Sequence, residues 1–275
     1  MVVRHDLRLA DGRTLCVYDT GGAQAPALVW HHGSPQSGAP LTPLVEAAAR
    51  RGLRLVTYGR PSYGGSTPQP GRDVASAAGD VAQIADALGL DRFAVMGASG
   101  GGPPALACAA LMPERVTGVV CLAGPAPYTG SPDWFEGMID PGGPRAALEG
   151  RDGRARHAET DEFDERSFTE ADYDTLAGAW KSLGEDAGHA GTTWPHGLID
   201  DDVASVKPWG FELEQVEAPV LVVQGGQDRV IPAAHAHQLV RGCPRAELWL
   251  RPFDGHVSVL GAVPVAMDWL LAYAT

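Results

Sequence analysis

The chain has 275 residues, of which 44% are hydrophobic and 20% charged, and its formal net charge at pH 7 is −13. This composition is ordinary for a globular protein that buries a sizeable core, and no apolar run approaches the roughly 20 residues that cross a bilayer. Nucleic-acid binding needs a basic patch that so acidic a chain does not offer, so we expect neither a nucleic acid nor a membrane as partner.

Strand and helix patterns alternate along the first 125 residues. Apolar runs of the strand type cover 14–20, 26–32, 53–59, 92–97 and 116–124, and helical patterns cover 41–52, 73–90 and 100–112. Asp73 is a plausible N-cap for the second of these helices. The alternation resumes late in the chain, with strands over 218–226 and 246–253 and helices over 232–242 and 258–273. Nearly continuous apolar strands separated by helices predict a mostly parallel α/β sheet that is covered on both faces.

The segment 127–207 interrupts this alternation. It shows no strand pattern, and residues 131–206 contain 18 acidic side chains against 6 basic ones. A stretch this long without sheet structure is expected to be an insertion with its own structure, commonly a lid. A Thr169–Asp172 capping box predicts a helix over 169–184 within it. We therefore predict a helical cap at 127–207, inserted into a core made of 1–126 and 208–275.

A glycine-rich turn joins the strand over 92–97 to the following helix. It reads Gly-Ala-Ser-Gly-Gly and places Ser99 between Gly97 and Gly101. A sharp strand-to-helix reversal holds the serine in a strained backbone conformation, and glycines two positions to either side avoid a collision. The turn also sets the hydroxyl beside a helix N-terminus, where developing negative charge is favoured. This context is typical of a nucleophilic serine.

A serine hydroxyl is a weak nucleophile that needs a base, and the base in turn needs a carboxylate to orient it. Both appear downstream, each directly after a predicted strand: Asp228 follows the strand over 218–226, and His256 follows the strand over 246–253. The order Ser99, Asp228, His256 is the one expected for a triad on this kind of sheet.

An oxyanion hole requires backbone N–H donors near the nucleophile. The residue after the nucleophile, Gly100, supplies one candidate. Ser34 supplies the other, from the loop His-His-Gly-Ser-Pro that follows the strand over 26–32. We interpret His31 and His32 as shaping this loop, not as taking part in the chemistry.

Taken together, these segments resemble the α/β-hydrolase superfamily over nearly the whole chain. The matching motifs are HHGSP (31–35), YGRPSYGGST (58–67), GASGG (97–101), GGQD (225–228) and DGH (254–256). The resemblance implies an α/β-hydrolase fold, with a mostly parallel eight-stranded sheet, helices on both faces and an inserted helical cap. Tyr58 departs from the family, which often has Asp at that position.

The resemblance and the three residues predict a serine hydrolase that cleaves a small-molecule ester, thioester, lactone or amide through an acyl-enzyme. Three alternatives remain open. The acidic cap permits an aminopeptidase of the proline iminopeptidase type, which binds a free amine. The same residues serve non-hydrolytic chemistry in some relatives, namely carbon–carbon bond cleavage or cofactor-free peroxidase activity. Other relatives are ligand-binding proteins without catalysis.

The cap is expected to roof the substrate pocket. Trp134, Trp180 and Trp194 are candidates for apolar substrate contacts, with packing inside the cap as the alternative for each. The sequence contains no phosphate-binding loop, nicotinamide fingerprint or metal-ligand cluster, so we expect no cofactor and no metal. The first 15 residues lack an apolar signal core, which leads us to expect a cytoplasmic protein.

Overall fold

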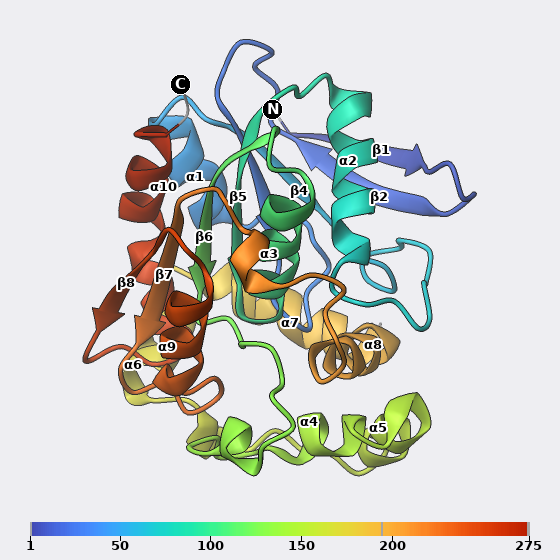
Figure 1. Ribbon diagram of the computed structural model, residues 1–275, viewed down its shortest axis with the longest axis vertical. Helices are drawn as coiled ribbons and strands as arrows, with labels where there is room; N and C mark the ends of the chain where they lie inside the picture. Colours follow the sequence, from blue (N-terminus) through green and yellow to red (C-terminus); the bar gives the residue numbers. More distant parts are fainter. Residues whose placement is uncertain (1, 194, 274–275) are drawn as a thin grey trace.

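The computed structural model describes residues 2–193 and 195–273. Its centre is an eight-stranded sheet with the strand order β1-β2-β4-β3-β5-β6-β7-β8 (Figure 1). The strands are β1 (Val3–Arg8), β2 (Thr14–Asp19), β3 (Ala27–His31), β4 (Arg54–Tyr58), β5 (Phe93–Ala98), β6 (Val116–Leu122), β7 (Val220–Gly225) and β8 (Ala246–Arg251). The strands from β3 to β8 pair in parallel, while β2 runs antiparallel to both β1 and β4. The mostly parallel sheet is therefore confirmed.

Helices cover both faces of this sheet, as predicted. One face carries α2 (Ser76–Leu88), α3 (Gly102–Leu111) and α9 (Ala233–Gly242), and the other carries α1 (Thr42–Arg50) and α10 (Val263–Leu271) (Figure 1). Because successive side chains of a strand point to opposite faces, Phe93 and Val95 of β5 join the first cluster, while Met96 joins the second. Each strand between the helix layers is thus apolar on both sides, which explains its continuous hydrophobic run.

The chain between β6 and β7 forms a separate group of helices. These are α4 (Gly142–Ala147), α5 (Gly150–Ala158), α6 (Glu170–Ala177), α7 (Lys181–Thr193) and α8 (Pro195–Ser205), with short 3₁₀ turns at Pro132–Phe135 and Glu165–Ser167. Figure 1 shows α4, α5, α7 and α8 beyond the arrowheads of the parallel strands. All of these helices fall inside 127–207. The division of the chain into a core and a cap domain at these boundaries stays a prediction.

Four local details differ from the sequence-based expectation. The N-cap of α2 is Ala75 and not Asp73, whose Oδ1 instead accepts the backbone N–H of Ser76. β1 was not anticipated, because most of its residues are exposed and its charged side chains hide any apolar period. The capping box of Thr169 and Asp172 is present, but the helix over 169–184 is divided, since α6 ends before Gly178 and α7 begins at Lys181. The closing helix begins with a 3₁₀ turn, Ser258–Ala262, before α10.

Within the described residues, no helix combines the length and the apolar character that crossing a membrane requires.

Candidate active site

Ser99 occupies the turn between β5 and α3. Its φ is +51°, in the left-handed region that side chains disfavour. An added Cβ at Gly97 would lie 2.0 Å from the carbonyl oxygen of Gly101, and one at Gly101 would lie 2.1 Å from the carbonyl oxygen of His31. Both glycines are therefore required by close backbone approach, as the sequence pattern suggested.

His256 and Asp228 meet Ser99 at the same edge of the sheet, because the carboxyl ends of parallel strands lie together. The Oγ of Ser99 is 3.0 Å from Nε2 of His256. On the other side of the imidazole, Nδ1 lies 2.8 Å from Oδ2 of Asp228, where the carboxylate accepts from the ring N–H. The structure thus brings the three predicted residues into one hydrogen-bonded line.

The surroundings hold Asp228 in place and tune His256. Oδ1 of Asp228 accepts the backbone N–H groups of Val230 and Ile231, at 2.9 and 2.8 Å. Burial alone would lower the pKa of His256, but the charge and hydrogen bond of Asp228, together with the charge of Asp172, outweigh it and raise the pKa above the ordinary value for histidine. The ring therefore binds a proton more readily than a free imidazole, as a group that accepts a proton from a hydroxyl should.

Ser34 and Gly100 approach each other closely beside Ser99. An added Cβ at Gly100 would lie 2.4 Å from Oγ of Ser34 and 3.7 Å from its backbone nitrogen. Both residues line the same cavity as Ser99. The two predicted oxyanion donors therefore lie side by side, and their role as donors stays a prediction.

A buried ion pair between core and cap holds both of these residues. Arg60, which follows β4, donates from Nη2 to Oγ of Ser34 at 2.8 Å and from Nη1 to the carbonyl oxygen of Gly100 at 3.3 Å. Asp201 of α8 accepts the Ser34 hydroxyl at 2.5 Å and pairs with Arg60 and Arg72. Burial alone would raise the pKa of Asp201, but the charges of the two arginines outweigh it and lower the pKa to about 2. The carboxylate is thus ionised throughout the physiological pH range.

His31, which ends β3, and His32 are buried and make hydrogen bonds inside the core, while their exclusion from the chemistry stays a prediction. The Nδ1–H of His32 donates to the carbonyl oxygen of Gly33 at 2.7 Å, and its Nε2 accepts the backbone N–H of Arg60 at 3.0 Å. Burial, with a smaller contribution from the charge of Arg60, lowers the pKa of His31 to about 3. Nδ1 of His31 lies 3.2 Å from the hydroxyl of Tyr58. Tyr58, which stands where the family often has Asp, is therefore buried in the core with a polar partner for its hydroxyl.

A cavity of about 210 Å³ opens over Ser34, Ser99 and Gly100. Apolar side chains form part of its wall, among them Pro125, Trp134, Met138 and Ile231, and charged side chains of the segment between β6 and β7 form another part. Trp134 is fixed there by a hydrogen bond from Nε1 to the carbonyl oxygen of Ala126, 2.9 Å long. Residues of the segment between β6 and β7 therefore line the space in front of Ser99.

Trp180, the second predicted tryptophan, does not line this cavity. Trp180 is buried with Leu183 in the apolar cluster that covers the α1 and α10 face of the sheet, and it is not among the described residues that line the cavity. Trp194 lies outside the described residues.

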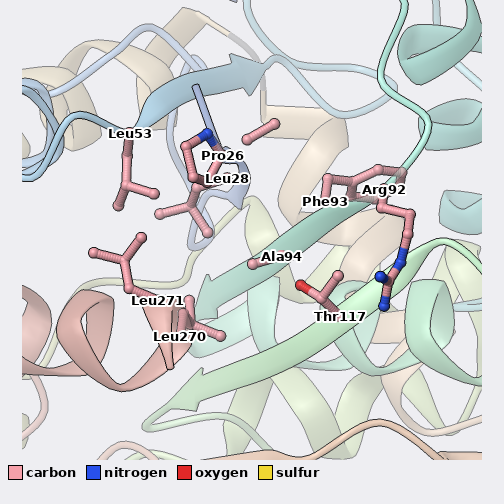
Figure 2. A pocket seen from close by; sticks show the side chains of 10 residues that line it. Pro26, Leu28, Leu53, Arg92, Phe93, Ala94, Thr117, Leu270 and Leu271 are labelled. Atoms are coloured by element: carbon pink, nitrogen blue, oxygen red, sulfur yellow. The ribbon is translucent and has the colours of Figure 1, made fainter. Parts of the chain in front are cut away.

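A second, much smaller cavity lies at the opposite end of the strands. Figure 2 shows it beside Pro26, Arg92 and Thr117, where β3, β5 and β6 begin. Its volume of about 30 Å³ is enough for a water molecule and not for an organic substrate. Of these two cavities, the one over Ser99 is the only one with room for chemistry.

Sequence reasoning missed two residues beside His256. The ring of Phe168 stacks on the imidazole, with centroids 6.5 Å apart and planes at 19°. Asp172 of α6 binds the backbone that follows His256. The capping box had identified Asp172 as a helix-start residue, but no local pattern indicates a contact with a segment more than 80 positions further along the chain.

Comparisons with known proteins agree with this architecture. The family model described as the alpha/beta hydrolase fold matches residues 26–262. The chain is 30% identical over 240 residues to the pimeloyl-[acyl-carrier protein] methyl ester esterase of Nitrosomonas europaea, covering 86% of this chain and 90% of that protein. It is 28% identical over 264 residues to the 2-hydroxy-6-oxononadienedioate/2-hydroxy-6-oxononatrienedioate hydrolase 1 of Dechloromonas aromatica, covering 87% and 83%.

Solved structures show the same fold. A thermophilic esterase from Thermogutta terrifontis aligns with a TM-score of 0.72 at 22% identity and covers 100% of both chains. The two sequence relatives are hydrolases by name, and the family model spans the strands that carry Ser99, Asp228 and His256. The chain therefore belongs to the α/β-hydrolase family.

Proposed function

We propose that the protein is a serine hydrolase that cleaves a small-molecule ester, thioester, lactone or amide through an acyl-enzyme. The observation that carries the proposal is the line from Asp228 through His256 to Ser99, with contacts of 2.8 and 3.0 Å. Ser99 itself lines a cavity that is also lined by residues between β6 and β7. The esterase from Nitrosomonas europaea lends support to ester chemistry.

The reaction begins with attack by Ser99. Its Oγ forms a bond to the carbonyl carbon while its proton passes to Nε2 of His256, and Asp228 stabilises the imidazolium that results. The carbonyl oxygen becomes an oxyanion, which the N–H groups of Ser34 and Gly100 bind. The tetrahedral intermediate then collapses, and the leaving group departs with the proton from His256.

Water completes the cycle. It gives a proton to Nε2 of His256 as its oxygen attacks the acyl carbon, and the second tetrahedral intermediate is bound by the same two N–H groups. Collapse of this intermediate breaks the bond to Oγ of Ser99, which takes back a proton from His256. The products are a carboxylic acid and the free enzyme.

The size of the cavity limits the size of the substrates that fit. A volume of about 210 Å³ is below the roughly 300–1,000 Å³ of sites that hold drug-sized ligands. Its wall combines apolar side chains with charged ones, namely Asp140, Arg154, Asp161, Asp201 and Asp202. The small volume accommodates short acyl groups better than long ones. We therefore expect acetyl and butyryl esters to be better substrates than octanoyl esters.

A panel of p-nitrophenyl esters tests the proposal, with wild type and Ser99→Ala compared on acetyl, butyryl and octanoyl substrates. We expect wild type to turn over the shorter esters with the higher kcat/KM, and Ser99→Ala to lose on the order of 10⁴–10⁶ in kcat. Circular dichroism checks that the variant is folded. Activity of Ser99→Ala within tenfold of wild type would end the assignment.

Aminoacyl p-nitroanilides, run beside the esters, separate the aminopeptidase alternative. A strong preference for a free α-amine would favour that alternative over simple ester hydrolysis.

A further inference from the structure

His256 lies in the segment between β8 and the 3₁₀ turn that opens at Ser258, outside any helix or strand. Its position therefore depends on what the neighbouring backbone contacts. Proton transfer demands that a base be held to within a fraction of an ångström of its partner. The contacts that hold this segment in place therefore determine the position of His256 relative to Ser99.

Asp172, in the first turn of α6, supplies the contacts. Its Oδ1 accepts hydrogen bonds from the backbone N–H groups of Val257 and Ser258, at 2.8 and 2.7 Å. The Ser258 hydroxyl donates to the same oxygen at 2.8 Å and itself accepts the N–H of Gly255 at 2.7 Å. The backbone on both sides of His256 is thus tied to one carboxylate of the cap.

The fit around this carboxylate is tight. Asp172 is 0% exposed, and an added Cβ at Gly255 would lie 2.1 Å from its Oδ2. Oδ2 also accepts the backbone N–H and the hydroxyl of Thr169, at 2.8 and 2.9 Å. Burial alone would raise the pKa of Asp172, but the hydrogen bonds from Ser258 and Thr169 outweigh it and lower the pKa. The group is therefore an ionised carboxylate with a single available orientation.

We propose that Asp172 is a positioning residue for His256, by which docking of the cap fixes the general base of the core. This inference rests on the proposed function, since it assigns Asp172 a part in the same site. Asp172 acts through Val257, Ser258 and Gly255 and does not touch the substrate. A cap that shifted away from the core would release the backbone on both sides of His256.

The charge of Asp172 gives this role a measurable signature. Two carboxylates act on His256, that of Asp228 after β7 and that of Asp172 on α6, while Ser99 and Phe168 present an uncharged hydroxyl and ring. His256 must be unprotonated to take the proton of Ser99. The negative charge of Asp172 raises the pKa of His256, so removing that charge lowers it and moves the acid limb of kcat/KM to lower pH.

Two substitutions of Asp172 distinguish the effect of its hydrogen bonds on the position of His256 from the effect of its charge on the pKa of His256. Asp172→Ala removes every bond to the segment, and we expect kcat per active site to fall by about 10²-fold with KM nearly unchanged. Asp172→Asn keeps an oxygen for Val257 and Ser258 but carries no charge, so we expect a smaller loss of kcat and an acid limb displaced to lower pH. Active sites are counted with a fluorophosphonate probe, so that unfolded protein does not enter kcat.

Glu170→Gln is the matched control, because it removes one negative charge from the same first turn of α6 at an exposed position. We expect it to keep the wild-type pH profile and kcat. If Asp172→Ala does not fold, the pH profile of Asp172→Asn still tests whether Asp172 acts on His256. The inference would be overturned if Asp172→Asn had the wild-type kcat per active site and if the acid limb of its kcat/KM profile lay at the same pH as in wild type. The thermal stability of the variant would not change this conclusion. Wild type that neither reacts with the probe nor cleaves esters would instead overturn the proposed function.

Discussion

Ser99 is held in a conformation that a residue with a side chain avoids. A positive φ of this kind typically costs about 1–3 kcal/mol and persists only where the surroundings impose it. Here the buried strand β5 and the buried start of α3 impose it, with Gly97 and Gly101 leaving room for the backbone. The same constraint presents Oγ of Ser99 to His256 in one orientation, which is what catalysis by a weak nucleophile requires.

Gly100 allows a direct test at this scale. A methyl group in Gly100→Ala would lie 2.4 Å from Oγ of Ser34, which cannot swing aside because Arg60 and Asp201 hold it. We expect the two backbone N–H groups to be forced apart and kcat for ester hydrolysis to fall by about 10²–10³-fold, the usual effect of losing one oxyanion donor. Steady-state kinetics on a short-chain ester measures it.

The control for this variant is Gly79→Ala in α2, where an added Cβ meets nothing within 4 Å. Alanine should stabilise that helix by roughly 0.5–1 kcal/mol and leave kcat unchanged. Wild-type kcat in Gly100→Ala would show that Ser34 and Gly100 do not act together on the oxyanion.

Among the elements between β6 and β7, α6 and α8 each place an aspartate against a segment that carries a proposed site residue. α6 turns Asp172 toward the segment of His256, and α8 turns Asp201 toward Ser34. α8 carries three consecutive aspartates, and successive helical positions point in different directions. Asp201 accordingly pairs with arginines of the core, whereas Asp202 pairs with Arg154 of α5 at 2.6 Å. Both α6 and α8 are thus held in place by charged side chains.

Asp202 is expected to make stability depend on pH. Burial, only partly offset by Arg154, raises its pKa from 3.8 to about 6. Between these values the folded state keeps a proton that the unfolded state has lost, so the free energy of unfolding falls as the pH rises, by at most about 1.4 kcal/mol per unit. Asparagine cannot ionise, so Asp202→Asn should lack this loss.

Urea unfolding of both proteins at pH 4, 5, 6 and 7.5 measures the effect. The free energy of unfolding of Asp202→Asn, minus that of wild type, should increase from pH 4 to 6 and level off above it. A difference that stays flat or decreases over this range contradicts the account of Asp202.

At the scale of the whole molecule, chain order was enough to place the candidate site. Ser99, Asp228 and His256 each follow an apolar strand, and parallel strands bring such positions to one edge of the sheet. The glycines around Ser99 could be read from the sequence because their cause is local. The alternation of strands and helices was recognisable for the same reason, since each element repeats its own apolar period.

Features that arise from long-range contacts could not be read in this way. β1 lacks the continuous apolar run of the central strands, because it lies at the edge of the sheet next to β2 and most of its residues are exposed. Nothing in the local sequence distinguishes Trp134 from Trp180. The fold of the segment between β6 and β7 nevertheless places Trp134 at the cavity and Trp180 in an apolar cluster of the core. Asp172 and Asp201 find their partners more than 80 positions away, where no periodicity connects them.

The central claim is that His256 activates Ser99 as a nucleophile. Peptide mapping by mass spectrometry after treatment with a fluorophosphonate tests it most directly, on wild type, Ser99→Ala and His256→Ala. The account predicts a single adduct on the peptide that contains Ser99, none in Ser99→Ala, and labelling slowed by orders of magnitude in His256→Ala. An adduct on another residue, or labelling of His256→Ala at the wild-type rate, would contradict it.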